Sequence, residues 1–300
     1  MFPGRRSYNP EKSRCKAAFF SGIGTGERQF FSKKCPGLAD TAYICRLKTR
    51  KQDVVDIVVD AGNTSVKVGV YTDDKLSDIF RVRYEDLSSV LPDFCAAHPV
   101  RYALVCSVGP EVAWDRLVKC KKMLKLSLRL SLGISNADAL NDEVGADRLA
   151  LVGGTALANP GQNVLLIDAG TCVTYDFIDT QGVYTCGNIS PGLQLRLNSM
   201  HQFTSNLPGL RFAQPKDDTT VRRLSTASCM RGGVIDGLVG EILYIVEEYR
   251  RQYGDFKIVL TGGDSAHLAE RVKNTIFAQP NYLLDSMHVI LKHNIQICES

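Results

Sequence analysis

The chain has 300 residues, of which 44% are hydrophobic and 23% charged, as in an ordinary soluble globular protein. This length allows one large or two modest domains, and no apolar run approaches the roughly 20 residues that a membrane-spanning helix needs. The net charge of +4 hides an asymmetry: residues 1–52 carry a surplus of nine positive charges, and the remainder has a net charge of −5. The body of the chain therefore gives no reason to expect nucleic-acid binding.

Residues 1–52 have no sustained apolar period and are rich in Arg, Lys, Gly and Ser. A transit peptide is basic in this way, but a convincing amphipathic helix is absent, and a secretory signal needs a continuous apolar core. We expect a basic, disordered N-terminal extension, or an upstream start assigned to a gene whose real start lies near Val54. A chain that begins near Lys51 is then expected to keep full activity, and loss of folding or activity on truncation would contradict this.

The ten cysteines include no Cys-x-x-Cys pair, and Cys106 and Cys172 lie inside apolar strands. This usage indicates reduced core cysteines of a cytosolic protein, with zinc or a disulfide framework as the minor alternative. The histidines show no metal-ligand spacing, and solvated or core roles are expected for all five: His98, His201, His267, His288 and His293.

The first predicted elements are an apolar strand over Val54–Asp60, a tight turn, and a second strand over Ser65–Tyr71. Gly62 and Asn63 tolerate positive φ angles, so the turn can expose backbone N–H groups in a small concavity. The carboxylate of Asp60 stands at the rim, where a hydrated cation fits. Such a loop suits a nucleotide phosphate carrying Mg²⁺, although an ordinary β-hairpin explains it equally well on its own.

The elements that follow have the order of a ribonuclease-H-like lobe, which is a meander of three strands and then alternating helix and strand. We expect a strand at Ser77–Tyr84, a helix at Glu85–Ala97, a strand at Tyr102–Val108, a helix at Glu111–Lys122 and a short strand at Leu124–Leu132.

Asp147 and Arg148 precede an Ala/Leu-rich helix that runs from Leu149 to about Ala158. The pair therefore falls in the first turn of a helix that links two lobes. Taken alone, it is an ordinary helix-start carboxylate beside a surface arginine.

A second copy of the hairpin strengthens the nucleotide interpretation. A strand over Gln162–Asp168, a Gly170-Thr171 turn and a strand over Cys172–Ile178 repeat the form of the first unit, 108 residues after Asp60. Two such units indicate duplicated lobes with a nucleotide between them.

The remaining elements complete the second lobe. Expected are a strand at Val183–Ile189, a helix at Leu193–Phe203, a polar loop at Pro208–Thr220, a long helix at Thr226–Arg250, a strand at Phe256–Leu260, a helix at Ser265–Val272 and a last strand at Met287–Lys292. The glycine pair Gly262-Gly263 stands between a strand and a helix, where it admits a flat adenine or ribose or forms a plain tight turn.

Several motifs in this order make the chain from about residue 53 to its end resemble the type III pantothenate kinases. They are Asp60-Ala61-Gly62-Asn63-Thr64-x-x-Lys67, Ser107-Val108-Gly109-Pro110, Gly145-Ala146-Asp147-Arg148, Asp168-Ala169-Gly170-Thr171, Ile189-Ser190-Pro191-Gly192 and Leu260-Thr261-Gly262-Gly263. The resemblance implies an α/β fold of two ribonuclease-H-like (actin-like ATPase) lobes with a nucleotide cleft between them. The expected domains are residues 53–147 and residues 148–300, the latter with the dimerisation surface. It also implies phosphorylation of pantothenate by ATP with Mg²⁺ and K⁺ or NH₄⁺, the first step of coenzyme A synthesis, in a cytoplasmic homodimer.

Site roles follow from the resemblance position by position. The ATP phosphates are held by Asp60, Ala61, Gly62, Asn63, Thr64, Ser65, Val66 and Lys67, with Thr171 as a further nucleotide contact. Asp60 lies near Mg²⁺ through water, and Asp168 is a ligand for the monovalent cation. Asp147 is the general base on the pantothenate hydroxyl, and the substrate site consists of Gly145, Ala146, Asp147, Arg148 and Thr226. Arg148 can form a forked pair with the pantothenate carboxylate.

Two departures from the family pattern stand out. Residues 132–143 lack the tyrosine that commonly contacts the substrate, and Cys172 replaces a small apolar residue. The rival interpretations are an actin-like kinase for another hydroxyl substrate and a non-enzymatic regulator resembling the Bvg accessory factors. The set of Asp60, Asp147, Arg148 and Asp168 favours catalysis, since a binding module needs no base.

Overall fold

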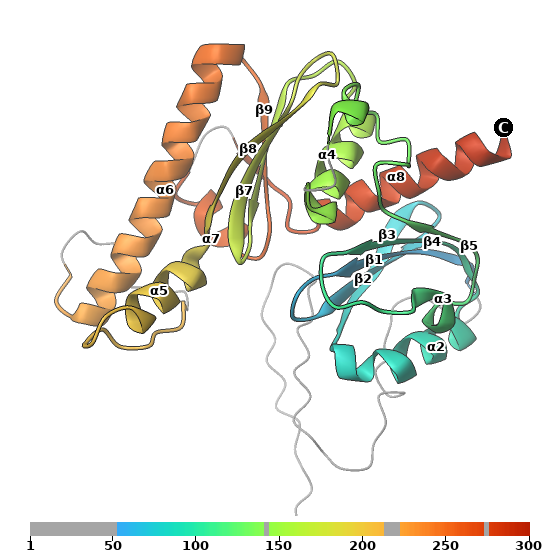
Figure 1. The fold of residues 1–300 in the computed structure, drawn as a ribbon, viewed down its shortest axis with the longest axis horizontal. Coiled ribbons are helices and arrows are strands. Elements are labelled where there is room, and N and C mark those ends of the chain that lie inside the picture. The colour runs from blue at the N-terminus through green and yellow to red at the C-terminus, as the bar shows by residue number, and fades with distance from the viewer. Residues whose placement is uncertain (1–52, 141–143, 213–222, 273–275) are drawn as a thin grey trace, which may run out of the picture.

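The computed structural model describes residues 53–140, 144–212, 223–272 and 276–300, which form two five-stranded sheets (Figure 1). Residues 1–52 and most of the loop predicted at Pro208–Thr220 lie outside these ranges. The two sheets fall on either side of the boundary expected between residues 147 and 148.

The first sheet has the order β3-β2-β1-β4-β5. Its first three strands form an antiparallel meander, and β4 and β5 add to β1 in parallel. Helices α2 and α3 follow β3 and β4 in the chain and lie below the sheet in Figure 1. The bounds are β1 Val55–Ala61, β2 Val66–Thr72, β3 Lys75–Val82, a 3₁₀ turn Tyr84–Asp86, α2 Leu87–Ala97, β4 Val100–Ser107, α3 Trp114–Leu117 and β5 Cys120–Lys125.

The second sheet repeats this topology with the order β10-β9-β6-β7-β8. Again the first three strands are antiparallel and the last two are parallel. The bounds are β6 Val164–Ala169, β7 Cys172–Ile178, β8 Tyr184–Pro191, α5 Leu193–Gln202, α6 Thr226–Tyr253, β9 Lys257–Thr261, α7 Ser265–Ala269 and β10 Ile276–Ala278. The predicted fold class, two ribonuclease-H-like lobes, is confirmed.

Two helices occupy the space between the sheets: α4, Ala146–Ala158, and α8, Tyr282–Glu299 (Figure 1). They pack mainly on each other, and α8 also packs on β1 and β4 although it comes from the end of the chain. A single hydrophobic cluster contains residues of both sheets and both helices, so the lobes share a core. Separate clusters fill the outer side of each sheet, beneath α2 in the first lobe and beneath α5 and α6 in the second.

Strand alternation determines which side chains face the space between the lobes. Along β1, Ile57 and Val59 belong to the outer cluster, whereas Val58 belongs to the shared one. Asp60 therefore faces inward, because successive side chains of a strand point to opposite sides. The same alternation along β6 puts Leu166 in the shared core and brings Asp168 to the inner face.

The sequence predictions between β4 and α4 were partly wrong. The helix expected at Glu111–Lys122 is a single turn, Trp114–Leu117, and the strand expected at Leu124–Leu132 is β5, which ends at Lys125. The segment of β5 has no β-branched residue, and it is extended because it pairs with β4, from Val100↔Cys120 to Val105↔Lys125. Tertiary pairing has overridden the local preference here.

The strand predicted at Met287–Lys292 is wrong, because this segment is the middle of α8. Leu284, Met287, Leu291 and Ile295 are buried with the three- and four-residue spacing of a helix.

Polar contacts also fix α8 on the first sheet. The ring of His288 stacks on Tyr71 at 3.9 Å, and Lys292 pairs with Asp74 at 2.9 Å. Asp56, Asp74 and His288 offer ligand atoms within 4.8 Å of one another, but Arg101 and Lys292 already neutralise the two carboxylates. Burial lowers the pKa of His288 to about 4, so the imidazole adds no charge at neutral pH.

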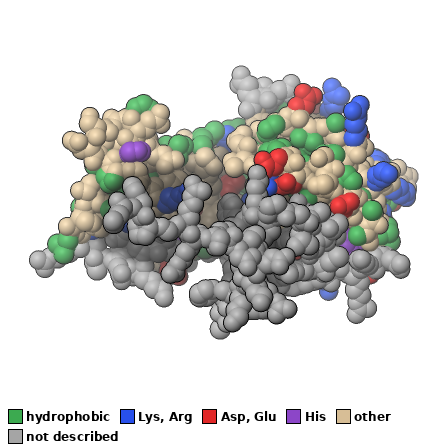
Figure 2. All heavy atoms as spheres, turned by 90° about the horizontal axis from the view of Figure 1, so that it is seen from below, with side chains coloured by type: hydrophobic (Ala, Val, Ile, Leu, Met, Phe, Trp, Pro, Cys, Tyr) green, Lys and Arg blue, Asp and Glu red, His purple; other side chains and the backbone are tan. Residues whose placement is uncertain are grey.

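Lys and Arg side chains gather at one end of the molecule, where Figure 1 places β5 and the C-terminus (Figure 2). Lys121 and Lys125 are largely exposed there and pair with Glu299 and Asp115. These two basic residues of β5 therefore belong to a solvated face. No helix of the described residues is both long and apolar enough to cross a membrane.

Candidate active site

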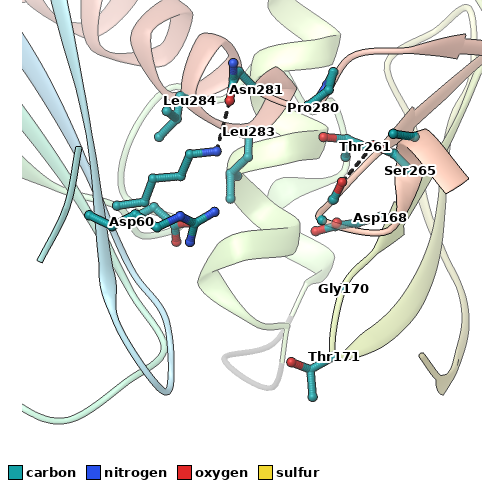
Figure 3. Close-up of a pocket in the computed structure, with 15 residues that line it drawn as sticks. Asp60, Asp168, Gly170, Thr171, Thr261, Ser265, Pro280, Asn281, Leu283 and Leu284 are labelled. Atoms are coloured by element: carbon teal, nitrogen blue, oxygen red, sulfur yellow. Dashed lines mark hydrogen bonds between the residues drawn. The ribbon is translucent and has the colours of Figure 1, made fainter. Parts of the chain in front are cut away.

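A cavity of about 550 Å³ opens between the lobes, a volume typical of small-molecule sites (Figure 3). Asp60 lines it from the first lobe and Asp168 from the second, and α8 contributes its start. The lining consists of Asp60, Lys67, Arg81, Asp168, Gly170, Thr171, Thr261, Gly262, Gly263, Ser265, Ala266, Pro280, Asn281, Leu283 and Leu284.

Three carboxylates from different elements converge on this region. Burial, and then the charge of Asp147, raise the pKa of Asp168 to about 7. Burial also raises the pKa of Asp60 to about 6, against the attraction of Lys67 and with a further upward contribution from Asp147. Because the negative charge of Asp147 disfavours ionisation of Asp60 and Asp168, a cation bound near these two carboxylates would stabilise their charged forms.

The ammonium group of Lys67 lies within this acidic cluster. It donates a hydrogen bond of 2.9 Å to the Oδ1 atom of Asn281, which is the dashed line that reaches Asn281 in Figure 3. Asn281 is the N-cap residue of α8, yet its side chain caps no backbone N–H of that helix. An N-cap side-chain oxygen usually accepts a backbone N–H of the first helical turn. In Asn281 this oxygen instead accepts a hydrogen bond from the ammonium group of Lys67, which comes from the first lobe.

The turn of the first hairpin is braced from two sides. The backbone N–H groups of Val108 and Gly109 donate to the carbonyl oxygen of Ala61 at 3.0 and 3.1 Å, and the hydroxyl of Tyr84 donates to that of Gly62 at 2.5 Å. A Cβ atom on Gly109 would lie 2.4 Å from the Gly62 oxygen, so only glycine allows this approach. The Ser-Val-Gly-Pro motif therefore supports the predicted phosphate loop.

The corresponding turn of the second lobe packs against the glycine pair after β9. Gly262 has a φ of +91°, and a Cβ atom there would lie 2.3 Å from the carbonyl oxygen of Ala169. Asp264 donates its backbone N–H to the same oxygen at 2.9 Å. Gly262 and Gly263 line the cavity, which leaves bare backbone where a flat ligand can approach closely.

Asp147 lies in the first turn of α4, behind the N-cap residue Gly145. Its Oδ1 atom accepts the backbone N–H of Arg148 at 2.8 Å, and a Cβ atom on Gly145 would lie 2.6 Å from the same oxygen. The helix start therefore orients the carboxylate. Asp147 is not among the residues that line the cavity, although its charge acts on Asp60 and Asp168.

Arg148 is held by a carboxylate of its own protein. Its Nε atom lies 3.1 Å from both Asp176 oxygens, and its Nη2 atom lies 2.6 Å from Oδ1. Asp176 is fully buried and also accepts the Tyr184 hydroxyl at 2.6 Å. The forked arrangement predicted for the substrate carboxylate is thus formed in part with Asp176.

The predicted ATP residues fall into two groups. Asp60, Lys67 and Thr171 line the cavity. Ala61 and Val66 are buried in the outer core of the first lobe, and only their backbone can face a ligand. Gly62, Asn63, Thr64 and Ser65 form the turn, with the side chains of Asn63 and Thr64 exposed.

The structure does not bring Thr226 to the cavity. Thr226 is exposed at the start of α6, and it is not a lining residue. Conversely, Arg81, Asn281 and Leu284 line the cavity and were not predicted. The helical spacing of apolar residues from Leu284 onward would have indicated α8, and with it the position of Asn281 at a helix start.

Two lobes of the same ribonuclease-H-like topology face each other across this cavity, each with an aspartate near the end of its first strand. The sequence model of the type III pantothenate kinases matches residues 56–248. This chain belongs to the type III pantothenate kinase family.

Individual relatives agree with this assignment. The type III pantothenate kinase of Flavobacterium johnsoniae is 37% identical over 242 residues, which are 80% of this chain and 98% of that protein. That of Christiangramia forsetii is 35% identical over 244 residues, with 80% and 99% covered. A solved structure from Campylobacter jejuni, assigned to the Baf family of transcriptional activators, has a TM-score of 0.53 at 17% identity and covers 80% of this chain and 99% of its own. That likeness shows the fold alone.

Proposed function

We propose that this chain transfers the γ-phosphoryl group of ATP to the hydroxyl group of pantothenate, the first step of coenzyme A synthesis. The observation that carries the proposal is the convergence of Asp60, Asp147 and Asp168 beside a cavity that both lobes line. Phosphoryl transfer depends mainly on positioning and charge neutralisation, and this arrangement offers sites for cations next to a candidate base.

We propose the following roles for the residues of the family motifs. The turn after Asp60, together with Lys67, holds the phosphates, and Thr171 contacts the nucleotide from the other lobe. Asp147 accepts the proton of the attacking hydroxyl, and Gly145 and Ala146 shape the substrate site beside it.

The proposed cations match the donor set. Carboxylate oxygens are preferred ligands of hard cations, and the raised pKa values of Asp60 and Asp168 are those of carboxylates that gain from a bound cation. Asp60 would hold Mg²⁺ through water, and Asp168 would hold K⁺ or NH₄⁺. The divalent ion supplies charge neutralisation on the phosphates when it is bound.

A coupled assay of ADP release tests the proposal directly. Pantothenate is compared with a panel of small hydroxyl substrates at equal concentrations. Turnover with pantothenate above all others is expected, preference for another alcohol would favour a different actin-like kinase, and absence of turnover with every substrate would favour the non-enzymatic alternative.

Replacement of Asp168 by Asn is expected to stabilise the ligand-free protein at pH 8. The folded pKa of about 7 lies above the ordinary 3.8, so the buried charge lowers stability as the pH rises through 7, and Asn removes this cost. We expect a gain of about 1–3 kcal/mol in the free energy of unfolding at pH 8 and little gain near pH 4.

The same variant tests the cation role with a readout other than activity. In the unaltered protein, K⁺ should raise the thermal midpoint and be required for full turnover, whereas Na⁺ should not replace it. In the Asp168→Asn variant, K⁺ should leave the midpoint unchanged. Full activity of the unaltered protein without K⁺ or NH₄⁺ would contradict the assignment.

A homodimer in the cytoplasm completes the proposal. Leu243 and Tyr244 on α6 are 50% and 64% exposed, an apolar pair that suits a subunit interface. Because Thr226 starts the same helix outside the cavity, its proposed contact with substrate requires a partner subunit. Light scattering coupled to size-exclusion chromatography should give about twice the mass of the chain.

The seven cysteines of the described residues are all free, in line with a reducing compartment.

A further inference from the structure

Three charged residues form a row across the inner face of the first sheet. The strand register pairs Asp60 of β1 with Lys67 of β2, and Lys67 with Arg81 of β3. All three line the cavity. Their chain neighbours Ala61, Val66 and Val82 point to the outer core, so the row is fixed in place by strand alternation.

The row is electrostatically unbalanced. One carboxylate faces two cations, and Lys67 and Arg81 are directly opposite each other on antiparallel strands, an arrangement that costs stability. Lys67 donates to the uncharged amide of Asn281. The guanidinium of Arg81 attracts Asp60 and so lowers that group's pKa, yet it has no hydrogen-bond or ion-pair partner among the described residues.

The neighbouring arginine shows what an ordinary surface residue does at this edge. Arg83 follows two positions later and pairs with Glu85 at 2.6 Å and with Asp86 at 2.8 Å. These contacts are local, and Arg83 does not line the cavity. Arg81 is also exposed, but it lines the cavity, where an anionic ligand could reach its guanidinium.

We propose that Arg81 is a catalytic residue whose guanidinium binds the phosphoryl group as it is transferred. This rests on the proposed ATP-dependent kinase function and extends it to a residue outside the recognised motifs. The planar fork of guanidinium donors matches two phosphate oxygens, and an arginine placed in this way stabilises the charge of the transition state.

The step balances without any change in Arg81. The alcohol oxygen forms a bond to the γ-phosphorus, the bond from that phosphorus to the bridging oxygen breaks, and ADP leaves with the electron pair. The alcohol proton goes to Asp147. Arg81 donates hydrogen bonds to non-bridging oxygens throughout and is regenerated unchanged.

The test compares Arg81→Met with Arg83→Met, because both changes remove one exposed guanidinium from the same edge. Arg81→Met should lower kcat at least 100-fold, whereas the affinity for Mg·ADP by titration calorimetry and the KM for pantothenate change less than threefold. Arg83→Met should keep kcat within twofold. Arg81→Lys should recover about tenfold of the loss, and millimolar guanidinium added to Arg81→Ala should restore part of the activity.

Other results would overturn the proposal. A kcat for Arg81→Met within fivefold of the unaltered protein would do so, as would equal losses in Arg81→Met and Arg83→Met. A fall in Mg·ADP affinity as large as the fall in kcat would show ground-state binding instead. The thermal midpoint monitors folding, and turnover of the unaltered protein with pantothenate is measured first, so failure of the function itself is recognised separately.

Discussion

The Asp147→Asn variant is expected to bind ATP but to lose nearly all phosphorylation of pantothenate. Asn has the same shape, and its side-chain oxygen can still accept the backbone N–H of Arg148, which Asp147 accepts at 2.8 Å. The start of α4 should therefore be preserved. The negative charge that accepts the hydroxyl proton is lost, and general-base contributions of this kind amount to about 10²–10⁴ in rate.

Nucleotide binding should survive for an electrostatic reason. The charge of Asp147 raises the pKa of both Asp60 and Asp168, so its removal makes these two carboxylates easier to ionise. Calorimetry with Mg·ADP should give an affinity equal to or above that of the unaltered protein, while coupled ADP release falls by two to four orders of magnitude. The acid limb of the pH–rate profile for residual activity should also move to lower pH.

Asp115→Asn is the matched control. Asp115 also lies in the first turn of a helix, α3, but it is 72% exposed and does not line the cavity. Its replacement should leave kcat and nucleotide affinity unchanged. If Asp147→Asn kept more than a tenth of the original kcat, Asp147 would not be the base.

The sequence allowed the two strand–turn–strand units to be predicted, because they depend on local pattern. The apolar run that ends at Asp60 and its copy that ends at Asp168 each specify a buried strand followed by a turn. Both sheets then follow from chain order and the alternation of helices and strands. Asp60 and Asp168 were singled out because each comes at the end of an apolar strand, whereas the proposed role of Asp147 came from the family resemblance.

The contribution of the C-terminal segment depended on long-range packing. Asn281 and Lys67 are separated by 214 positions and meet only because α8 returns to the first sheet. Arg81 was missed for a different reason. Its strand pairing with Lys67 makes it part of the cavity, and a lone arginine in a predicted strand is otherwise indistinguishable from a solvated residue. For Arg148, the family resemblance implied a contact with the substrate, but the sequence could not show that the buried carboxylate of Asp176 holds its guanidinium.

Replacement of Asp176 by Ala is expected to destabilise the protein and to weaken its binding of pantothenate together. Asp176 has no exposed surface, and the Arg148 side chain is only 12% exposed, so the guanidinium cannot turn to water when its partner is removed. Loss of one member of such a pair costs about 3–5 kcal/mol, and here the Tyr184 hydroxyl also loses its acceptor. Urea denaturation should show this loss as a lower midpoint with an unchanged slope.

The KM values distinguish a loss of Arg148 orientation from a general loss of folded protein. Arg148 without Asp176 keeps its charge but not its direction, so the KM for pantothenate should rise about tenfold while the KM for ATP stays within threefold. If Asp176→Ala fails to fold, Asp176→Asn can be used, because it retains one acceptor oxygen. It should also raise the KM for pantothenate more than the KM for ATP, but by a smaller factor. An unchanged KM for pantothenate in a folded variant would show that Asp176 does not position Arg148 for substrate.

The ion pair between Arg101 and Asp56 is a control for the pair between Arg148 and Asp176, because the two pairs differ in how far the arginine is exposed. Asp56 is 2% exposed and holds both Nε and Nη2 of Arg101, at 3.0 and 2.7 Å, in the same forked manner. Arg101, however, is 41% exposed and can turn to water when its partner is removed. Asp56→Ala should therefore cost clearly less stability than Asp176→Ala and leave both KM values unchanged. Equal losses in the two variants would mean that the exposure of the arginine does not set the cost, and that Arg148 is no more constrained than a surface residue.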